Sequence, residues 1–321
     1  MATIFDVAKK AGVSKSTVSR AINSNGYVSK ESKKKILKAA SELNYSPSIL
    51  ARQFRKQSTK KIGFVVKTYY PAVGELLSCS ADVFKRHGYN VTVYFTKSKD
   101  EETFILESFK LHTLDALFFV ANRNDWSYIA QYAQYGPIVT WRRTDHREIY
   151  SSYIDHYPLY QNILQYVYDK YGEVNIGHVL NSPEKNNTKA RLRAIDEFQQ
   201  SHPQANNSWK VFFPEQGHAG RDAAMDLLHL ADRPDVVIVY SDYVAAEFIA
   251  TLRDQGMEVP KDIKVFGFDN SDFGKFMNIS TVDTQLAMQS KNLSNRIIST
   301  LEKTEFEVLT IEPQLVIRKS C

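Results

Sequence analysis

Cysteine is scarce in this chain, and long apolar runs are absent. The two cysteines, Cys79 and Cys321, lie far apart in 321 residues, which disfavours a disulfide framework or a cysteine-ligated zinc site. No apolar run reaches the roughly 18 residues that a membrane-spanning helix needs, and no secretory leader precedes Thr3. We therefore expect no metal site, no contact with a membrane, and a location in the cytoplasm.

The motifs of common enzyme classes are also lacking. The sequence has no glycine-rich phosphate-binding loop, no nucleophile elbow and no cluster of metal-ligating side chains, and its 8 histidines are scattered. We expect neither a cofactor nor catalysis.

Acidic residues are few in the first 61 residues. This segment holds 14 lysines and arginines but only 3 acids, Asp6, Glu31 and Glu42, for a net charge of +11. The remaining 260 residues have a net charge of −6, so the basic excess is confined to one end. Such confinement is typical of a nucleic-acid-binding head on an ordinary acidic body.

Residues 3–23 have the pattern of two short helices separated by Gly12. Thr3, with Asp6 three residues on, can cap the first helix, and Ser14 can cap the second. Gly12 suits the left-handed turn between them. In the second helix, helical spacing places Val18, Ala21 and Ile22 on one face and Lys15, Ser16, Ser19 and Arg20 on the other. This pattern predicts a DNA-binding helix-turn-helix; the alternative is a surface helical hairpin with a solvated polar face.

A third helix is predicted after Ser29, which can cap it. We expect its buried stripe to comprise Ile36, Leu37, Ala40 and Leu43, and its exposed side to carry Lys33, Lys34, Lys35 and Lys38.

From residue 61 the pattern alternates between short apolar runs and helical stretches. The expected strands are 62–66, 91–95, 116–120 and 137–140, then 175–180, 209–213, 236–240 and 263–267. The expected helices are 75–87, 100–111 and 128–135, then 159–171, 189–201, 220–229 and 243–255. The fold class is therefore a small all-α helix-turn-helix head followed by an α/β core of two doubly wound parallel-sheet lobes. Ligands of such sheets bind beyond the carboxyl ends of the strands, which predicts a cleft between the lobes.

The head resembles the lactose-repressor/galactose-repressor (LacI/GalR) family of bacterial transcription regulators. The pattern D-V-A-x-x-A-G-V-S-x-x-T-V-S-R-x-x-N is matched from Asp6 to Asn23, V-S at Val28-Ser29, and L-N-Y-x-P-x-x-x-A-R from Leu43 to Arg52. The body is more loosely similar, through L-x-x-x-G-x-x-V-P-x-D at 252–262 and G-F-D at 267–269. The resemblance implies a periplasmic-binding-protein-like sensor core.

The resemblance also implies the domain limits. They are 1–45 for the DNA-binding domain, 46–60 for a hinge helix or linker, and 61–321 for the core. Lobe 1 spans about 61–156 and 283–309, and lobe 2 about 157–282 and 310–321. The resemblance also implies a final strand at 314–318. Because the sequence stops just after it, without the heptad helix by which the lactose repressor forms tetramers, we expect a homodimer.

For DNA, the resemblance places the second helix in the major groove and the hinge helix in the minor groove. The implied contact residues are Ser14, Lys15, Ser16, Thr17, Ser19, Arg20, Asn23, Ala51, Arg52 and Phe54. Lys15 and Ser16 occupy the variable specificity positions. Phe54 stands where the family inserts a leucine wedge, and it can kink the duplex or be an exposed linker aromatic.

For the effector, the resemblance implies a set of cleft residues. They are Tyr70, Ala72, Trp141, Arg142, Arg191, Arg193, Phe213, Ser241, Asp242 and Asp269. Arg191, or alternatively Arg193, matches the arginine that grips the ligand, since Ala194 replaces the family's glycine. Asp242 and Asp269 either bind sugar hydroxyls or hold the loop. For each charged residue of this set, the alternative is an ordinary charge on the surface of a helix.

The cleft departs from the family at several positions. Ala72-Val73 replaces an aromatic pair, Arg142-Arg143 replaces Asp-Arg, and Ser241 replaces an asparagine. Phe213 or Trp141 is the candidate for stacking on a sugar ring. Since Arg142 removes a hydroxyl acceptor and adds an anion binder, the effector is expected to be a phosphorylated or acidic sugar, or a larger oligosaccharide.

The resemblance implies a repressor of carbohydrate-utilisation genes. A small sugar or sugar phosphate bound between the lobes would control its affinity for a pseudo-palindromic operator, and the protein would be associated with the nucleoid. The alternatives are a cytoplasmic sugar-binding protein without regulatory output, a transport protein and a sugar-metabolising enzyme.

Overall fold

The computed structural model describes residues 2–23, 26–45, 58–213 and 217–321. Its contacts divide the chain into two units, Met1–Lys60 and Lys61–Cys321. The hinge residues Ala51, Arg52 and Phe54 lie outside the described residues. None of the helices described is both long and apolar enough to cross a bilayer.

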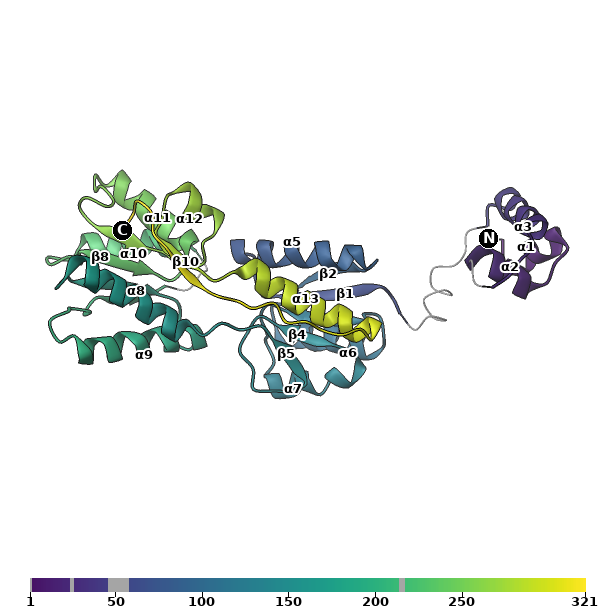
Figure 1. The fold of residues 1–321 in the computed structure, drawn as a ribbon, viewed down its shortest axis with the longest axis horizontal. Helices are drawn as coiled ribbons and strands as arrows, with labels where there is room; N and C mark the ends of the chain where they lie inside the picture. The colour runs from purple at the N-terminus through teal and green to yellow at the C-terminus, as the bar shows by residue number, and fades with distance from the viewer. Residues whose placement is uncertain (1, 24–25, 46–57, 214–216) are drawn as a thin grey trace. The chain divides into compact units, whose positions relative to one another are not determined.

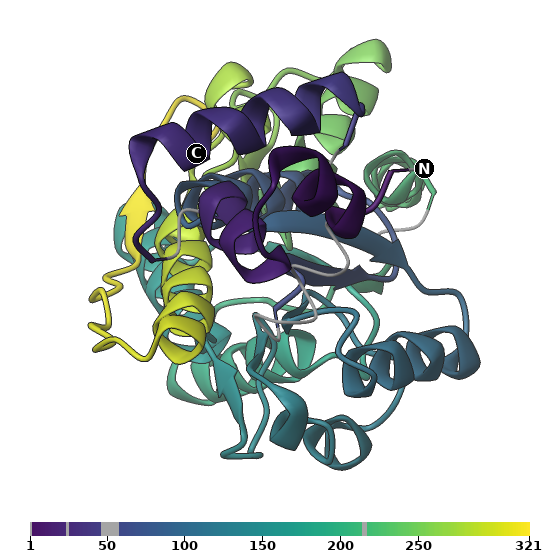
Figure 2. The ribbon, with the colours of Figure 1, turned by 90° about the vertical axis from the view of Figure 1, so that its right-hand side faces the viewer.

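The first unit consists of three helices, α1 (Ile4–Ala11), α2 (Lys15–Asn23) and α3 (Lys30–Glu42). In Figure 2 the longer α3 lies across the two shorter helices. The expected caps are confirmed: the Asp6 carboxylate accepts from the Thr3 backbone N–H at 2.8 Å, and Ser14 Oγ accepts from the Thr17 N–H at 3.1 Å. Gly12 has φ +66°, in the left-handed region where a side chain would be strained.

The expected burial of Leu37 is wrong. Its side chain is 51% exposed, whereas Ile36 and Ala39 are buried in the small core with Val7 and Val18. Successive residues of a helix point about 100° apart, so Leu37 cannot share the face of Ile36. Ala39, three residues after Ile36, completes the buried stripe instead.

Lobe 1 of the second unit is built on a five-stranded parallel sheet of order β2-β1-β3-β4-β5. The strands are β1 (Lys61–Val66), β2 (Asn90–Phe95), β3 (Ala116–Phe119), β4 (Ile138–Thr140) and β5 (Ile149–Ser151). Helices α5 (Pro71–Arg86) and α13 (Leu286–Glu302) cover one face, and α6 (Lys99–Lys110) and α7 (Trp126–Ala130) the other (Figure 1). Phe64 points to the first layer and Val65 to the second, so the central strand is buried on both faces.

Lobe 2 repeats this plan on a four-stranded parallel sheet of order β7-β6-β8-β9. The strands are β6 (Ile176–Leu180), β7 (Lys210–Phe212), β8 (Val236–Val239) and β9 (Lys264–Phe266). Helices α8 (His156–Tyr171) and α9 (Asn186–Ser201) cover one face, and α10 (Ala219–Leu228) and α11 (Asp242–Asp254) the other. The short α12 (Asp272–Phe276) packs beside α11.

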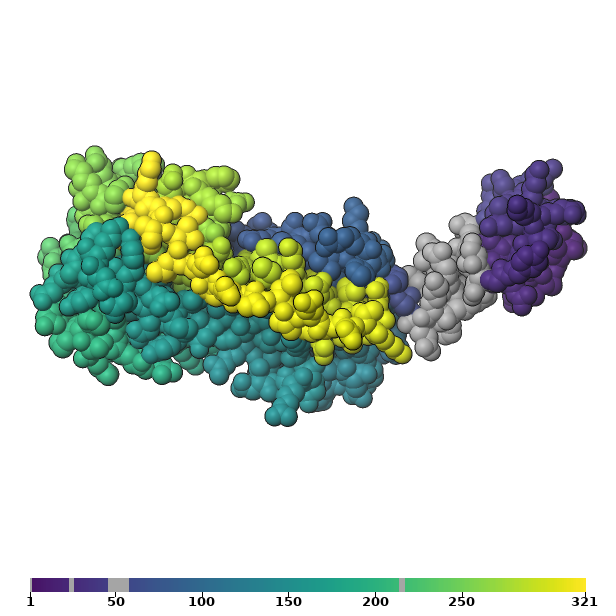
Figure 3. Space-filling model, viewed as in Figure 1, coloured from purple at the N-terminus to yellow at the C-terminus, as the bar shows by residue number. Residues whose placement is uncertain are grey.

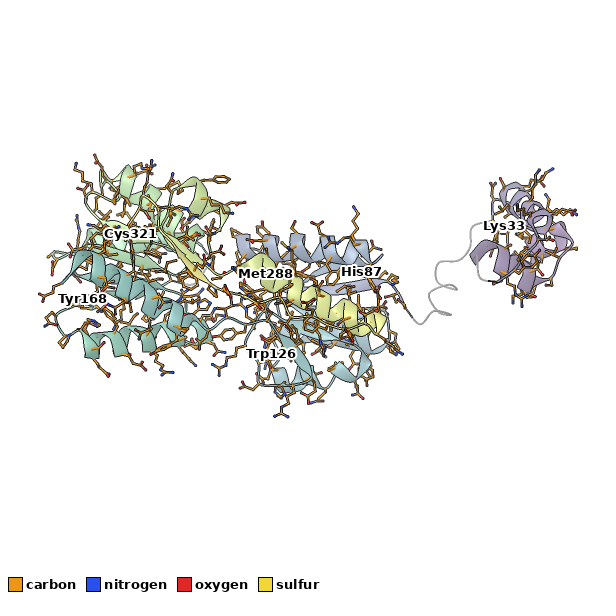
Figure 4. The ribbon with its side chains drawn as sticks, in the orientation of Figure 1. Lys33, His87, Trp126, Tyr168, Met288 and Cys321 are labelled. Carbon is orange, nitrogen blue, oxygen red and sulfur yellow. The ribbon has the colours of Figure 1, made fainter. Side chains whose placement is uncertain are left out.

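The chain passes between the lobes more than once. It enters lobe 2 after β5, returns after β10 (Thr281–Asp283) to form α13, and ends on β11 (Gln314–Val316), which pairs antiparallel with β10. The segment after α13, yellow in Figure 3, runs along the surface from one lobe to the other. In Figure 4, Met288 and Trp126 mark lobe 1, and Tyr168 and Cys321 mark lobe 2.

Some element limits differ from those expected. Helix α5 starts at Pro71 rather than near residue 75, because proline is well suited to the first turn of a helix. The stretch 128–135 is not one helix: α7 ends at Ala130, and a 3-10 turn follows at Ala133–Tyr135. Strand β5 and helix α12, three and five residues long, have no counterpart among the expected elements.

Candidate functional site

Helix α2 presents a polar face with a basic character. Lys15, Ser16 and Arg20 are exposed, whereas Val18 and Ala21 on the opposite side are buried in the three-helix core. Lys15 Nζ lies 4.4 Å from the centroid of the Phe5 ring, and this contact positions the lysine at the start of the helix. The separation of faces expected from the sequence is therefore present.

The remaining polar residues in and before α2 are less exposed or cap the helix. Ser14 is the N-terminal cap, and its hydroxyl also lies 2.8 Å from the Thr17 hydroxyl. Thr17 and Ser19 are half-buried. Asn23 is the last residue of the helix.

A cavity of about 580 Å³ lies between the two lobes and is lined by residues of both. Most of the expected effector residues line it: Tyr70, Ala72, Trp141, Arg142, Arg191, Ser241 and Asp269. It lies at the carboxyl ends of the strands, since Trp141 follows β4 and Ser241 follows β8 closely. We call this cavity the effector cleft.

Arg193 and Phe213 do not line the effector cleft. Arg193 lines a neighbouring hollow, which shares Trp126, Arg143 and Asn186 with the cleft. Arg193 is exposed on α9 and binds Glu197, Nε to Oε1, at 2.7 Å. Because residues two apart on a helix point about 200° apart, Arg191 and Arg193 cannot both face the cleft. Phe213 packs instead against the lobe 2 core that contains Val237 and Val239.

Asp242 is fully buried and holds a loop, the second of its two expected roles. Its carboxylate accepts from the Ser271 N–H at 2.8 Å and from the Thr281 hydroxyl at 2.7 Å. A Cβ at Gly267 or Gly274 would fall 2.3 Å from its oxygens, so this loop closes tightly around the carboxylate. Burial raises the pKa of Asp242 to about 6, against the lowering effect of its hydrogen bonds.

Arg191 projects from α9 and is buried at the edge of the effector cleft. Its Nη2 donates to the Tyr240 carbonyl at 3.1 Å and lies 3.1 Å from His156 Nδ1. The guanidinium lies over the Phe268 ring, 4.3 Å from its centroid, and the His156 ring stacks on the same phenylalanine. Since a guanidinium only donates, Nδ1 of His156 must accept. The pKa of His156 lies well below its usual value because of burial and the nearby charges of Arg191 and Arg142.

The lobe 1 wall of the cleft holds a second arginine. Arg142 Nε donates to the Val120 carbonyl at 2.8 Å, and Nη2 donates to the Tyr70 hydroxyl at 2.8 Å. Its guanidinium lies 4.9 Å from the Trp141 ring centroid, and Trp141 Nε1 in turn donates to Gln289 Oε1 at 2.8 Å. These contacts fix a cation and an aromatic ring side by side.

Several lining residues were not anticipated from the sequence: Lys67, Glu75, Trp126, His156, Lys185 and Gln289. Lys67 directly follows β1, so the rule that ligands bind at strand carboxyl ends could have identified it. His156 and Lys185 each stand at the start of a helix that faces the cleft. The sequence does not indicate that Gln289 belongs to the cleft, because this residue reaches the cleft only when α13 folds back onto lobe 1.

The charged groups of the cleft are unevenly distributed. Burial lowers the pKa of Lys67, and the charges of Lys185, Arg123 and Arg142 lower it further. Burial raises the pKa of Glu75, whose acidic neighbours are Asp272 and Asp283, while Lys275 opposes them. Lys67 therefore has mainly cationic neighbours, and Glu75 has more acidic ones. We call the part of the cleft around Lys67 and Lys185 its basic end.

Comparison with known proteins gives a family model for part of each unit. Residues 3–48 match the model of bacterial regulatory proteins of the lacI family, and residues 170–321 match that of a periplasmic binding protein-like domain. The HTH-type transcriptional repressor PurR of Histophilus somni is 30% identical over 348 residues, covering 100% of this chain and 99% of PurR. The NTD biosynthesis operon regulator NtdR of Bacillus subtilis is 28% identical, covering 100% of both chains.

Solved structures agree on the fold. The lac repressor dimer bound to operator and the anti-inducer ONPF has a TM-score of 0.83 at 19% identity, covering 99% of this chain and 98% of that one. The complex of the transcriptional regulator CelR with cellobiose has a TM-score of 0.70 at 20% identity, covering 100% of both chains. The head matches the lacI family model, the core has two lobes, and the PurR repressor is 30% identical over the whole chain. The chain therefore belongs to the LacI family of bacterial regulatory proteins and is a DNA-binding transcriptional regulator.

Proposed function

We propose that this regulator represses carbohydrate-utilisation genes and that a small sugar or sugar phosphate in the effector cleft controls its operator affinity. The observation that carries this proposal is a cavity with walls from both lobes. A ligand that contacts both walls favours one separation of the lobes over others, and any process coupled to that separation then responds to the ligand.

The chemistry of the walls favours a carbohydrate. Trp141 offers an aromatic surface, and Arg142, Arg191 and Asp269 offer polar groups from the two lobes. Apolar faces with a few placed polar groups suit a sugar ring, which has C–H surfaces and hydroxyl edges. CelR bound to cellobiose and a LacI family regulator of Lactobacillus casei bound to sucrose share this fold and support the class.

For the DNA side, we propose that α2 enters the major groove. Lys15, Ser16 and Arg20 would reach base edges, and Ser14, Thr17, Ser19 and Asn23 would hold the helix in register. Ala51, Arg52 and Phe54, outside the described residues, are proposed to act in the minor groove. A homodimer would place two such helices on the two half-sites of a pseudo-palindromic operator. The solved lac repressor dimer bound to operator supports this arrangement.

The proposal is tested by operator selection followed by ligand titration. Duplexes selected from a random pool by the purified full chain should share a pseudo-palindrome, and the affinity for them should fall steeply with salt. Sugars and sugar phosphates found by thermal shift are then added to the complex. A ligand that binds the chain without altering operator affinity would favour the alternative, a sugar-binding protein without regulatory output.

A further inference from the structure

The basic end of the effector cleft is formed by cations of both lobes. We propose that an anionic group of the effector, a phosphate on a sugar, is held between Lys67 of lobe 1 and Lys185 of lobe 2 and draws the lobes together. This inference rests on the proposed function, and it specifies both the effector class and the way in which the effector closes the cleft.

The two lysines come from opposite walls of the same cavity. Lys67 directly follows β1, at the carboxyl end of an inner strand of the lobe 1 sheet. Lys185 immediately precedes α9 of lobe 2. Both line the effector cleft together with Arg142 of lobe 1 and Arg191 of lobe 2. An anion placed between the walls therefore meets positive charge on each side.

The lysines interact electrostatically without a ligand. The charge of Lys185 disfavours the protonated form of Lys67, as do the charges of Arg123 and Arg142. Lys67 and Lys185 therefore repel each other across the cleft, and this repulsion opposes closure of the empty cleft. A phosphate with nearly two negative charges replaces that repulsion with two attractions, each strongest when the lobes approach.

Two acids, Asp125 and Glu184, line the cleft together with the lysines, and Glu184 accepts from the Ser182 hydroxyl at 3.1 Å. Glu102 is the one carboxylate among the groups that act on Lys67, and it favours the charged lysine. Its oxygens are already engaged, since they accept from the backbone N–H groups of Arg123 and Asn124 at 2.6 and 2.7 Å. Glu75 also lines the cleft, but its charged neighbours are on α12 and β10.

The rest of the cleft suits the neutral part of such a molecule. Trp141 is held by its hydrogen bond to Gln289, and Glu75 and Asp269 line the cavity as hydroxyl acceptors. A sugar phosphate thus matches the charge division, with its phosphate at the lysines and its hydroxyls toward the acids. A neutral sugar leaves the repulsion between the lysines unrelieved.

The test is calorimetric titration of the full chain with hexose monophosphates, the matching unphosphorylated hexoses, and inorganic phosphate. We expect a hexose phosphate to bind at least about tenfold more tightly than its hexose. Lys67→Met and Lys185→Met should each weaken binding of the phosphate ester by about tenfold or more and leave binding of the hexose nearly unchanged. Lys85→Met and Lys261→Met remove exposed lysines elsewhere in lobes 1 and 2 and should have little effect.

Closure is measured separately by small-angle scattering. The phosphate ester should compact the parent chain and fail to compact Lys185→Met, even at saturating concentration. Circular dichroism of each variant shows whether α9 and the lobes remain folded, and a variant with an altered spectrum is replaced by Lys→Gln at the same position.

Several outcomes would overturn the inference. They are equal affinity for ester and hexose, equal losses for both ligands in the lysine variants, and a chain that binds no hexose phosphate and no inorganic phosphate. If the chain still binds selected operator DNA and a neutral sugar alters that affinity, only the lysine bridge fails. If no carbohydrate alters operator affinity, the proposed function fails as well.

Discussion

Asp242 is a buried carboxylate that organises a loop, and its burial makes the stability of the fold depend on pH. Its raised pKa means that the folded chain binds a proton there up to about pH 6, whereas the ordinary aspartate pKa of 3.8 applies to the unfolded chain. The stabilising contribution of this group is therefore complete below pH 3.8 and is lost as the pH rises through about 6. The difference between the two pKa values corresponds to about 3 kcal/mol.

Asp242→Asn removes this titration while keeping an oxygen that can accept from the Ser271 N–H. We expect the free energy of unfolding of the variant to fall less than that of the parent as the pH rises from 3.8 to about 6. Urea unfolding at a series of pH values measures the difference. Asp254→Asn changes an exposed site at the end of the same helix. Its free energy of unfolding should depend on pH as that of the parent does. Identical slopes for Asp242→Asn and the parent would refute the assignment.

His156 lies where the chain enters lobe 2 and holds Arg191 through Nδ1. His156→Ala removes this acceptor, and we expect the affinity for the hexose phosphate to fall by about tenfold, the value of one hydrogen bond to a charged group. His156→Asn offers an amide oxygen in its place and should restore part of the affinity. Calorimetry distinguishes the variants; no loss in His156→Ala would show that Arg191 needs no support from the histidine.

At the scale of elements, α2 is the helix whose side chains should read DNA. Arg20→Ala should weaken binding to the selected operator by about 1–3 kcal/mol and relax the preference at one base pair. Lys35→Ala removes a lysine of α3 that is paired with Glu31 at 2.8 Å and should leave base preference unchanged. Binding to a set of single-base operator variants measures both effects, and equal base preference in Arg20→Ala and the parent would exclude direct reading by Arg20.

The elements were largely predictable from the sequence because their signals are local. Caps at Thr3, Ser14 and Ser29, and apolar runs such as 62–66, depend on neighbouring residues only. The errors arose where a local pattern was ambiguous. Leu37 was assigned to a buried stripe that Ala39 completes, and β5 is too short to have a recognisable pattern.

At the scale of the whole molecule, the cleft was less predictable than the fold. The sequence indicates Arg191 through its match to the family and Trp141 through its place after a strand. Lys185 and Gln289 line the cleft only because separate segments meet there. Whether Arg191 or Arg193 faces the cleft depends on the rotation of α9, which the sequence leaves open. The sequence thus located the cleft, and the distribution of charge within it required the structure.

Effector binding between the lobes and operator binding by the head are proposed to be coupled. Such coupling is reciprocal, so the effector must change operator affinity by the factor with which the operator changes effector affinity.

The most direct test measures both affinities of the full chain by fluorescence anisotropy, operator with and without saturating hexose phosphate, and a labelled hexose phosphate with and without operator. We predict equal factors of about 5- to 150-fold in the two directions. A chain that binds both molecules with no change in either affinity would show that the cleft and the head are not coupled.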